Sequence, residues 1–275
     1  MAARPGVHEQ EPARLLGAAG LPRRGGSLQG DALLVSPLVT LTSDFGVGSP
    51  YVAAMKAAVL AACPTAQLVD LSHSVAPFDI LGGGFLLWAG SQGFPAGTVH
   101  LAVVDPGVGS ERRALALQVE AAFFVGPDNG LFSAVVRDRT EVRAVALSRP
   151  PAASATFEGR DVFAPVAGRL AAGEELTALG SPAEGLTVLA DPGPCVLWVD
   201  NFGNLVTSLR PPIGPLRIGG RTVSASARTY AEAPPEVPFW YVGSLGLVEV
   251  GVRQGRADRL LGVGVGAAIE ELPSS

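Results

Sequence analysis

Apolar and polar residues follow two different patterns along the first 180 residues. Short runs rich in Val and Leu, typical of strands, occur at 38–43, 67–72 and 98–104. Between them lie two segments with helix signals. One begins at Ser49-Pro50, a capping hydroxyl before a proline that suits the first turn, and continues through Ala-rich residues to 62; the other spans 79–92. This alternation of strands and helices predicts a mostly parallel sheet with helices on its faces.

The chain then adds further strands to this sheet. The runs at 114–119 and 121–126 predict a hairpin, and 142–147 predicts another strand. Residues 156–173 begin as a turn and continue with a helical pattern that ends at a glycine. Residues 37–180 are therefore predicted to form one α/β domain.

The pattern changes after residue 180. Helical periodicity disappears, Pro and Gly become frequent, and short strand-like segments follow one another, at 195–200, 204–209, 216–220, 222–225, 239–243 and 245–252. Residues 181–275 are therefore predicted to form a small all-β domain, a barrel or a sandwich. Residues 1–36, rich in Ala, Gly, Arg and Pro without apolar periodicity, are predicted to be a flexible extension.

Composition narrows the classes of partner. The 275 residues carry a formal net charge of −5 without a basic stripe, which argues against nucleic acid. No apolar run reaches the roughly 18 residues of a membrane span, and the amino terminus lacks a signal-peptide pattern. The two cysteines and three histidines form no spacing pattern for disulfides or metals. These features predict a cytoplasmic protein that binds a small molecule or a protein partner, and they indicate no metal site.

Charged residues follow the predicted strands at their carboxyl ends. Asp105-Pro106-Gly107 ends the strand at 98–104, and Arg112 follows a few residues later. Asp44 follows the first strand and His73 the second. Open α/β sheets place their chemistry at this edge. Taken alone, however, Asp-Pro-Gly also fits a tight turn with a surface ion pair, and His73 fits a buried structural histidine.

Six motifs in order resemble those of one known family. They are TSDFG (42–46), VDLSHSVAPFDI (69–80), VVDPGVGSERR (103–113), GPDNG (126–130), TFEGRDVFAP (156–165) and DNFGN (200–204). Over residues 37–270 the chain is similar to the S-adenosyl-L-methionine (SAM) hydroxide adenosyltransferases, or SAM hydrolases, which are relatives of the SAM-dependent fluorinase and chlorinase.

The resemblance implies a fold, an assembly and a reaction. It implies an α/β domain followed by a β-barrel, and a homotrimer that binds SAM between the first domain of one subunit and the second domain of its neighbour. Water or hydroxide then displaces L-methionine at C5′ and leaves adenosine, with SAM as substrate and no further cofactor. Halogenating relatives carry an insertion before the central strand ends; residues 90–104 leave no room for one, which favours the hydrolase branch.

The resemblance also implies roles for residues of the first domain. Asp105 and Arg112 match two members of an Asp-Arg-His catalytic set, and Asp44 matches a carboxylate that binds the ribose hydroxyls. Phe78 and Phe157 match positions that line the nucleoside pocket. The residue types alone leave other interpretations open: Asp44 also fits a cap of the following helix, and the two phenylalanines also fit a hydrophobic core.

Three further positions lie in the second domain. Asp200 and Asn204 match residues that reach the methionine or the nucleoside, although Asp-Asn-Phe-Gly-Asn by composition is simply a turn. Ser244 aligns with a residue near the methionine carboxylate. The halogenases carry arginine at the next position, which is Leu245 here, so this sequence lacks that contact.

Glu158 departs from the family pattern, which has histidine there. Because a sulfonium leaves as neutral methionine, the enzyme has mainly to position a water and remove its proton. Asp105 is the expected acceptor, oriented by Arg112, and Glu158 is expected to be a second acceptor, provided that Arg112 separates the two carboxylates. The missing histidine leaves two alternatives open, namely a protein that binds SAM or adenosine without turnover and, less favoured, a halide-using transferase.

Overall fold

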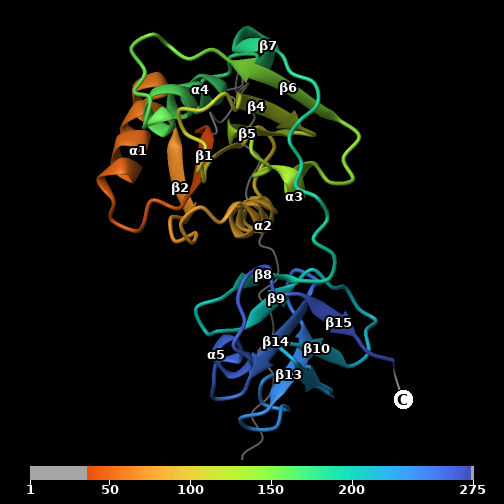
Figure 1. The fold of residues 1–275 in the computed structure, drawn as a ribbon. Coiled ribbons are helices and arrows are strands. Elements are labelled where there is room, and N and C mark those ends of the chain that lie inside the picture. The colour runs from red at the N-terminus through yellow and green to blue at the C-terminus, as the bar shows by residue number, and fades with distance from the viewer. Residues whose placement is uncertain (1–35, 274–275) are drawn as a thin grey trace, which may run out of the picture. The chain divides into compact units, whose positions relative to one another are not determined.

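The computed structural model describes residues 36–273, and the predicted extension lies outside them apart from its last residue. The described chain contains the two predicted domains, an α/β domain followed by a β-rich domain (Figure 1).

The first domain is built on a seven-stranded mixed sheet with the order β2-β1-β3-β5-β4-β6-β7. Its strands are β1 (Leu38–Ser43), β2 (Gln67–Ser72), β3 (Val99–Val103), β4 (Ala114–Val119), β5 (Ala122–Pro127), β6 (Val142–Leu147) and β7 (Gly180–Pro182). β2, β1, β3 and β5 pair in parallel, whereas β4 pairs antiparallel with both β5 and β6. The predicted parallel core and the hairpin that extends it are confirmed.

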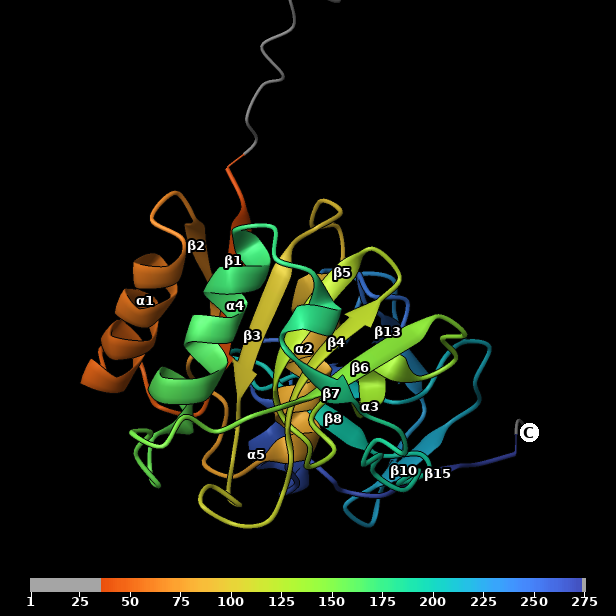
Figure 2. The same cartoon turned by 90° about the horizontal axis from the view of Figure 1, so that it is seen from above.

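Helices cover both faces of this sheet (Figure 2). They are α1 (Pro50–Ala62), α2 (Ile80–Ser91), α3 (Ser133–Val136) and α4 (Ala164–Ala171), with a π-helical turn (Gly159–Phe163) before α4 and a 3-10 turn (Leu176–Ala178) after it. α1 and α4 pack on one face, and α2 and α3 pack on the other. The Ser49 hydroxyl caps α1 by accepting from the Tyr51 N–H, so the interpretation of Asp44 as the cap of this helix is wrong.

The core forms because β3 is buried on both faces. Val99, Leu101 and Val103 pack with α1 and α4, while Ala102 packs with α2 and α3. α1 and α4 approach closely at Gly168, where an added Cβ would lie 2.6 Å from the Val59 carbonyl oxygen. Burial on both faces fixes the carboxyl end of β3, from which the candidate site extends.

The second domain contains two sheets, a three-stranded sheet in the order β11-β10-β15 and a five-stranded sheet in the order β12-β13-β14-β9-β8. The strands are β8 (Val196–Val199), β9 (Leu205–Thr207), β10 (Leu216–Ile218), β11 (Arg221–Val223), β12 (Ala225–Ser226), β13 (Pro238–Val242), β14 (Val248–Val252) and β15 (Ile269–Glu271). The β-rich character is confirmed. A short helix, α5 (Ala257–Leu261), was not predicted.

No helix within residues 36–273 is long and apolar enough to cross a lipid bilayer.

Candidate active site

Asp105 and Arg112 form a buried pair at the carboxyl end of β3. Arg112 Nε donates a 2.9 Å hydrogen bond to Asp105 Oδ1, and Arg112 Nη2 contacts Oδ2, so the guanidinium grips the carboxylate with two parallel contacts. The Arg112 side chain is only 8% exposed and the Asp105 side chain only 6%. The alternative of a surface ion pair on a tight turn is therefore wrong.

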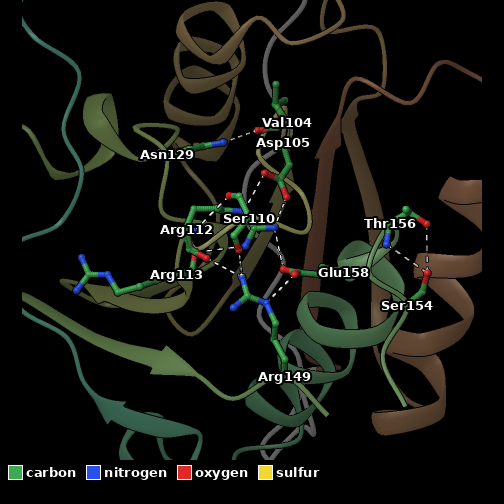
Figure 3. Close-up of polar contacts among 10 residues, drawn as sticks. All are labelled: Val104, Asp105, Ser110, Arg112, Arg113, Asn129, Arg149, Ser154, Thr156 and Glu158. Carbon is green, nitrogen blue, oxygen red and sulfur yellow. Dashed lines mark hydrogen bonds and ion pairs between the residues drawn. The ribbon is translucent and has the colours of Figure 1, made fainter. Parts of the chain in front are cut away.

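Glu158 joins this pair from a distant part of the chain (Figure 3). Its Oε2 lies 2.8 Å from Arg112 Nη2, and its side chain is 2% exposed. Arg112 thus lies between the two carboxylates, as their coexistence requires. Burial alone lowers the pKa of the Arg112 guanidinium, but the hydrogen bond and charge of Asp105, together with the charge of Glu158, outweigh burial and leave the pKa above its ordinary value.

A second arginine, Arg149, completes the cluster. It lies in the loop after β6; its Nε donates a 2.6 Å hydrogen bond to Glu158 Oε1, and its Nη2 donates a 2.6 Å hydrogen bond to the backbone carbonyl of Arg112 (Figure 3). Sequence reasoning missed Arg149, because a single arginine before two prolines has no local pattern that marks it. The cluster therefore contains two carboxylates and two guanidiniums.

The backbone around Glu158 is unusual. Glu158 directly precedes the π-helical turn, and such turns are rare and frequent at functional sites. Phe163, at the end of this turn, places its ring 5.3 Å from the Arg112 guanidinium carbon, a cation–π contact. Gly109, in the loop after β3, has φ +79° and lies so close to the Ala155 carbonyl that a Cβ would be 2.8 Å from it. The loop carrying Arg112 and the loop leading to Glu158 are thereby packed together.

Asp44 and Phe78 meet at the neighbouring strand ends. Asp44 Oδ2 accepts a 3.0 Å hydrogen bond from the Phe78 N–H, which leaves the other carboxylate oxygen for a ligand. The Phe78 side chain is 69% exposed, so its interpretation as a core residue is wrong. The adjacent His73 is buried and its Nδ1 lies 2.7 Å from Ser43 Oγ, which agrees with a structural histidine.

Phe157 is partly buried in an aromatic group. Its ring lies 5.9 Å from that of Phe45 and 5.1 Å from that of Tyr51, both edge to face. The group packs against the core formed with α1 and α4. Phe157 thus lies at the margin of the core, beside Glu158 in the chain.

The second-domain candidates lie in a tight turn. Asp200 Oδ1 accepts from the Phe202 and Asn204 N–H groups, both at 2.8 Å, and Oδ2 accepts from Asn204 Nδ2 at 2.7 Å. Asp200 therefore shapes the turn and orients the Asn204 amide. Asn204 lines a pocket of about 590 Å³ together with two residues that sequence reasoning missed, the 77% exposed Phe202 and Tyr230. Ser244 lies exposed in the turn between β13 and β14, outside the residues that line this pocket.

The structure thus brings the candidates together in three groups: Asp105 with Arg112 and Glu158, Asp44 with Phe78, and Asp200 with Asn204. In the described residues, no cluster of three or more His, Cys, Asp and Glu side chains forms a metal site.

Fold and site define a two-domain α/β protein with a buried acid–arginine cluster at the carboxyl end of a parallel strand, where such sheets hold small-molecule chemistry. Residues 39–180 match the SAM hydroxide adenosyltransferase N-terminal domain, and residues 194–270 match the C-terminal domain of the same family. The chain belongs to the SAM hydroxide adenosyltransferase family.

Individual relatives agree with this assignment. The chain is 41% identical over 254 residues to the (R)-S-adenosyl-L-methionine hydrolase of Thermus thermophilus, which covers 85% of this chain and 99% of that protein. It is 25% identical over 210 residues to a fluorinase of Actinoplanes, covering 66% of this chain and 70% of the fluorinase. An uncharacterized conserved protein from Thermotoga maritima has a similar structure, with a TM-score of 0.79 and 30% identity, covering 86% of this chain and all of that one.

Proposed function

We propose that the protein is an (R)-SAM hydrolase, which converts the (R) epimer of SAM and water into adenosine, L-methionine and a proton. The observation that carries the proposal is the buried Asp105–Arg112 pair at the end of β3, in a chain 41% identical to an (R)-SAM hydrolase along nearly all of that protein's length.

The proposed step is an in-line displacement. The oxygen of a water attacks C5′ of the ribose, the bond from C5′ to sulfur breaks, and its electron pair leaves with the sulfur of methionine. The Asp105 carboxylate accepts the proton of the attacking water, while the two contacts from Arg112 hold this carboxylate in one orientation. Each Asp105 oxygen keeps a second lone pair for the water. The leaving group becomes neutral, so the reaction needs no stabilisation of an oxyanion.

The remaining candidates are proposed to bind the substrate. The free oxygen of Asp44 is suited to the ribose hydroxyls, and the exposed ring of Phe78 and the edge of Phe157 are suited to the apolar faces of the nucleoside. In the second domain, Asn204 offers an amide whose orientation Asp200 fixes, and Ser244 offers an exposed hydroxyl for the methionine carboxylate.

The proposal includes a homotrimer with the substrate between subunits. The residues that line the Asn204 pocket all belong to the second domain, which supports a site that a neighbouring subunit completes. If so, a variant that is strictly monomeric loses turnover, whereas full activity in a monomer contradicts the shared site. A cytoplasmic location stays a prediction from sequence, and localisation of the tagged protein in cells tests it.

Product analysis tests the reaction itself. The purified protein is incubated with a mixture of (R) and (S) SAM, with and without chloride, and the products are separated by chromatography. We expect adenosine and methionine in equal amounts, with only the (R) epimer consumed. Formation of 5′-chloro-5′-deoxyadenosine would indicate the halide-using alternative. Tight SAM binding without any product would indicate the binding-protein alternative.

A further inference from the structure

Glu158 is closed off from solvent by two arginines. Oε1 accepts from Arg149 Nε at 2.6 Å, and Oε2 lies 2.8 Å from Arg112 Nη2 in an ion pair that lacks hydrogen-bond alignment. Oε2 itself has almost no solvent-accessible surface, and the whole side chain is 2% exposed. A water that uses Glu158 as its acceptor therefore has no open position beside it.

The positive charge of Arg149 balances the negative charge of Glu158. Without Glu158, the buried cluster would hold only the balanced pair of Asp105 and Arg112. Glutamate adds a negative charge to a site from which water is largely excluded, and an unpaired buried charge is strongly unfavourable. Arg149, with its side chain 39% exposed, reaches in from the loop after β6 and restores the balance.

Arg149 also holds the main chain of Arg112. Its Nη2 donates to the backbone carbonyl of Arg112, while its Nε holds the carboxylate that contacts the tip of the Arg112 side chain (Figure 3). Arg112 is thus fixed at its main chain by Arg149 and at its guanidinium by Glu158. The position of Arg112 in turn sets the orientation of Asp105.

We propose that Arg149 and Glu158 act as one positioning pair, which fixes Arg112 and, through it, Asp105. This inference rests on the proposed function. It revises the expectation from sequence, because Glu158 acts through Arg112 and not as an acceptor for the reacting water.

Kinetics of Arg149→Gln, Glu158→Gln and the double variant test the pair. We expect kcat to fall roughly 10- to 100-fold in each single variant, because small displacements of reacting groups have such effects, with KM changed less than about threefold. The double variant should be about as slow as the slower single variant, because the two residues act as a unit. Arg169→Gln is the matched control, since Arg169 binds Glu174 through the same kind of 2.6 Å Nε contact and is similarly exposed at 44%.

Three outcomes of these kinetic measurements overturn the inference. The first is an Arg149→Gln variant whose kcat stays within about twofold of the wild type. The second is a double variant whose loss is the product of the single losses. The third concerns the pH profile of kcat/KM. A positioning role keeps the acidic limb of this profile in Glu158→Gln, whereas loss of that limb would identify Glu158 as a proton acceptor.

Two further measurements keep the test independent of folding and of turnover. Arg149→Ala should regain activity on addition of methylguanidinium, which fills the vacated position, whereas Arg169→Ala should not respond; equal responses would contradict the pair. If the wild type forms no adenosine, the proposed function is wrong, and the contact between the pair and Arg112 is then tested by NMR. We expect the Arg112 Nε–H signal to shift in Arg149→Gln and to stay unchanged in Arg169→Gln. An unchanged signal in both variants would contradict the inference.

Discussion

Asp105→Asn separates the chemistry of the site from its stability. Asparagine keeps the shape of the side chain and one oxygen for Arg112 Nε, but it removes the carboxylate charge and turns an NH₂ group toward Arg112 Nη2. Arg112 still has Glu158 as a partner, so the buried guanidinium is not left alone. We therefore expect the loss of a charge-assisted hydrogen bond, about 1.5–3 kcal/mol, and a protein that still folds.

The effect on catalysis should be larger. A positioned base contributes about 10²- to 10⁴-fold, so kcat should fall by that factor, which corresponds to about 3–5 kcal/mol of barrier. The assay is adenosine formation at saturating SAM, with unfolding in urea measured in parallel. Asp128→Asn is the matched control, because Asp128 is an equally buried carboxylate (5% exposed) that pairs with Arg113. It should lose stability while kcat stays within about threefold.

The result that would refute this reasoning is a kcat for Asp105→Asn within about threefold of the wild type. An equal fall of kcat in both variants would also refute it, because the loss would then reflect the disruption of any buried acid–arginine pair.

Three other predictions concern binding, pH and packing. Asp44→Asn should raise KM about tenfold to a hundredfold with a smaller change in kcat, because the substitution weakens charge-assisted hydrogen bonds to the ribose. Steady-state kinetics measure both constants, and an unchanged KM would contradict a role of Asp44 in binding the ribose. Burial lowers the pKa of His100 from 6.5 to about 4, so the folded protein holds it neutral and its contribution to stability is lost as pH falls from 6.5 toward 4. Between pH 7 and pH 5, the free energy of unfolding of the wild type, measured in urea, should therefore fall by about 2 kcal/mol more than that of His100→Gln. Parallel pH profiles for the two proteins would exclude a contribution of the neutral His100 to stability. Gly168→Ala should lower the unfolding free energy by about 1–3 kcal/mol, because the added Cβ would clash with α1. Gly264→Ala, whose Cβ would meet open space, should change the unfolding free energy by less than about 0.5 kcal/mol. Equal effects of the two substitutions would rule out the packing argument.

The elements of the first domain could be predicted because each carries a local signal. The Val- and Leu-rich runs, the Ser49-Pro50 start and Asp79, whose side chain accepts from the Gly82 N–H, are all properties of short segments. The short helix α5 has only five residues, too few for a helical period to be read. The π-helical turn after Glu158 has only five residues and carries no sequence pattern that distinguishes it from an α-helical start.

The candidate site was predictable only in part, for a similar reason. Asp105 and Arg112 are close in sequence, so one loop brings them together. Arg149 approaches Glu158 because β6 pairs with β4 and delivers the following loop to this place. Phe202 and Tyr230 line one pocket through the pairing of distant strands. A lone arginine or tyrosine gives no sign in the sequence of what it will contact in the fold.

The uneven exposure of Arg149 and Glu158 bears on how such a site changes in evolution. An arginine that is 39% exposed can arise first at position 149 and stay hydrated until a partner appears. A glutamate that is 2% exposed cannot be hydrated in this way, so without the arginine its charge would be buried without a full complement of partners. Lineages that carry both residues should therefore have acquired the arginine before the acid. Reconstructed intermediates that carry only one of the two replacements would reveal this order.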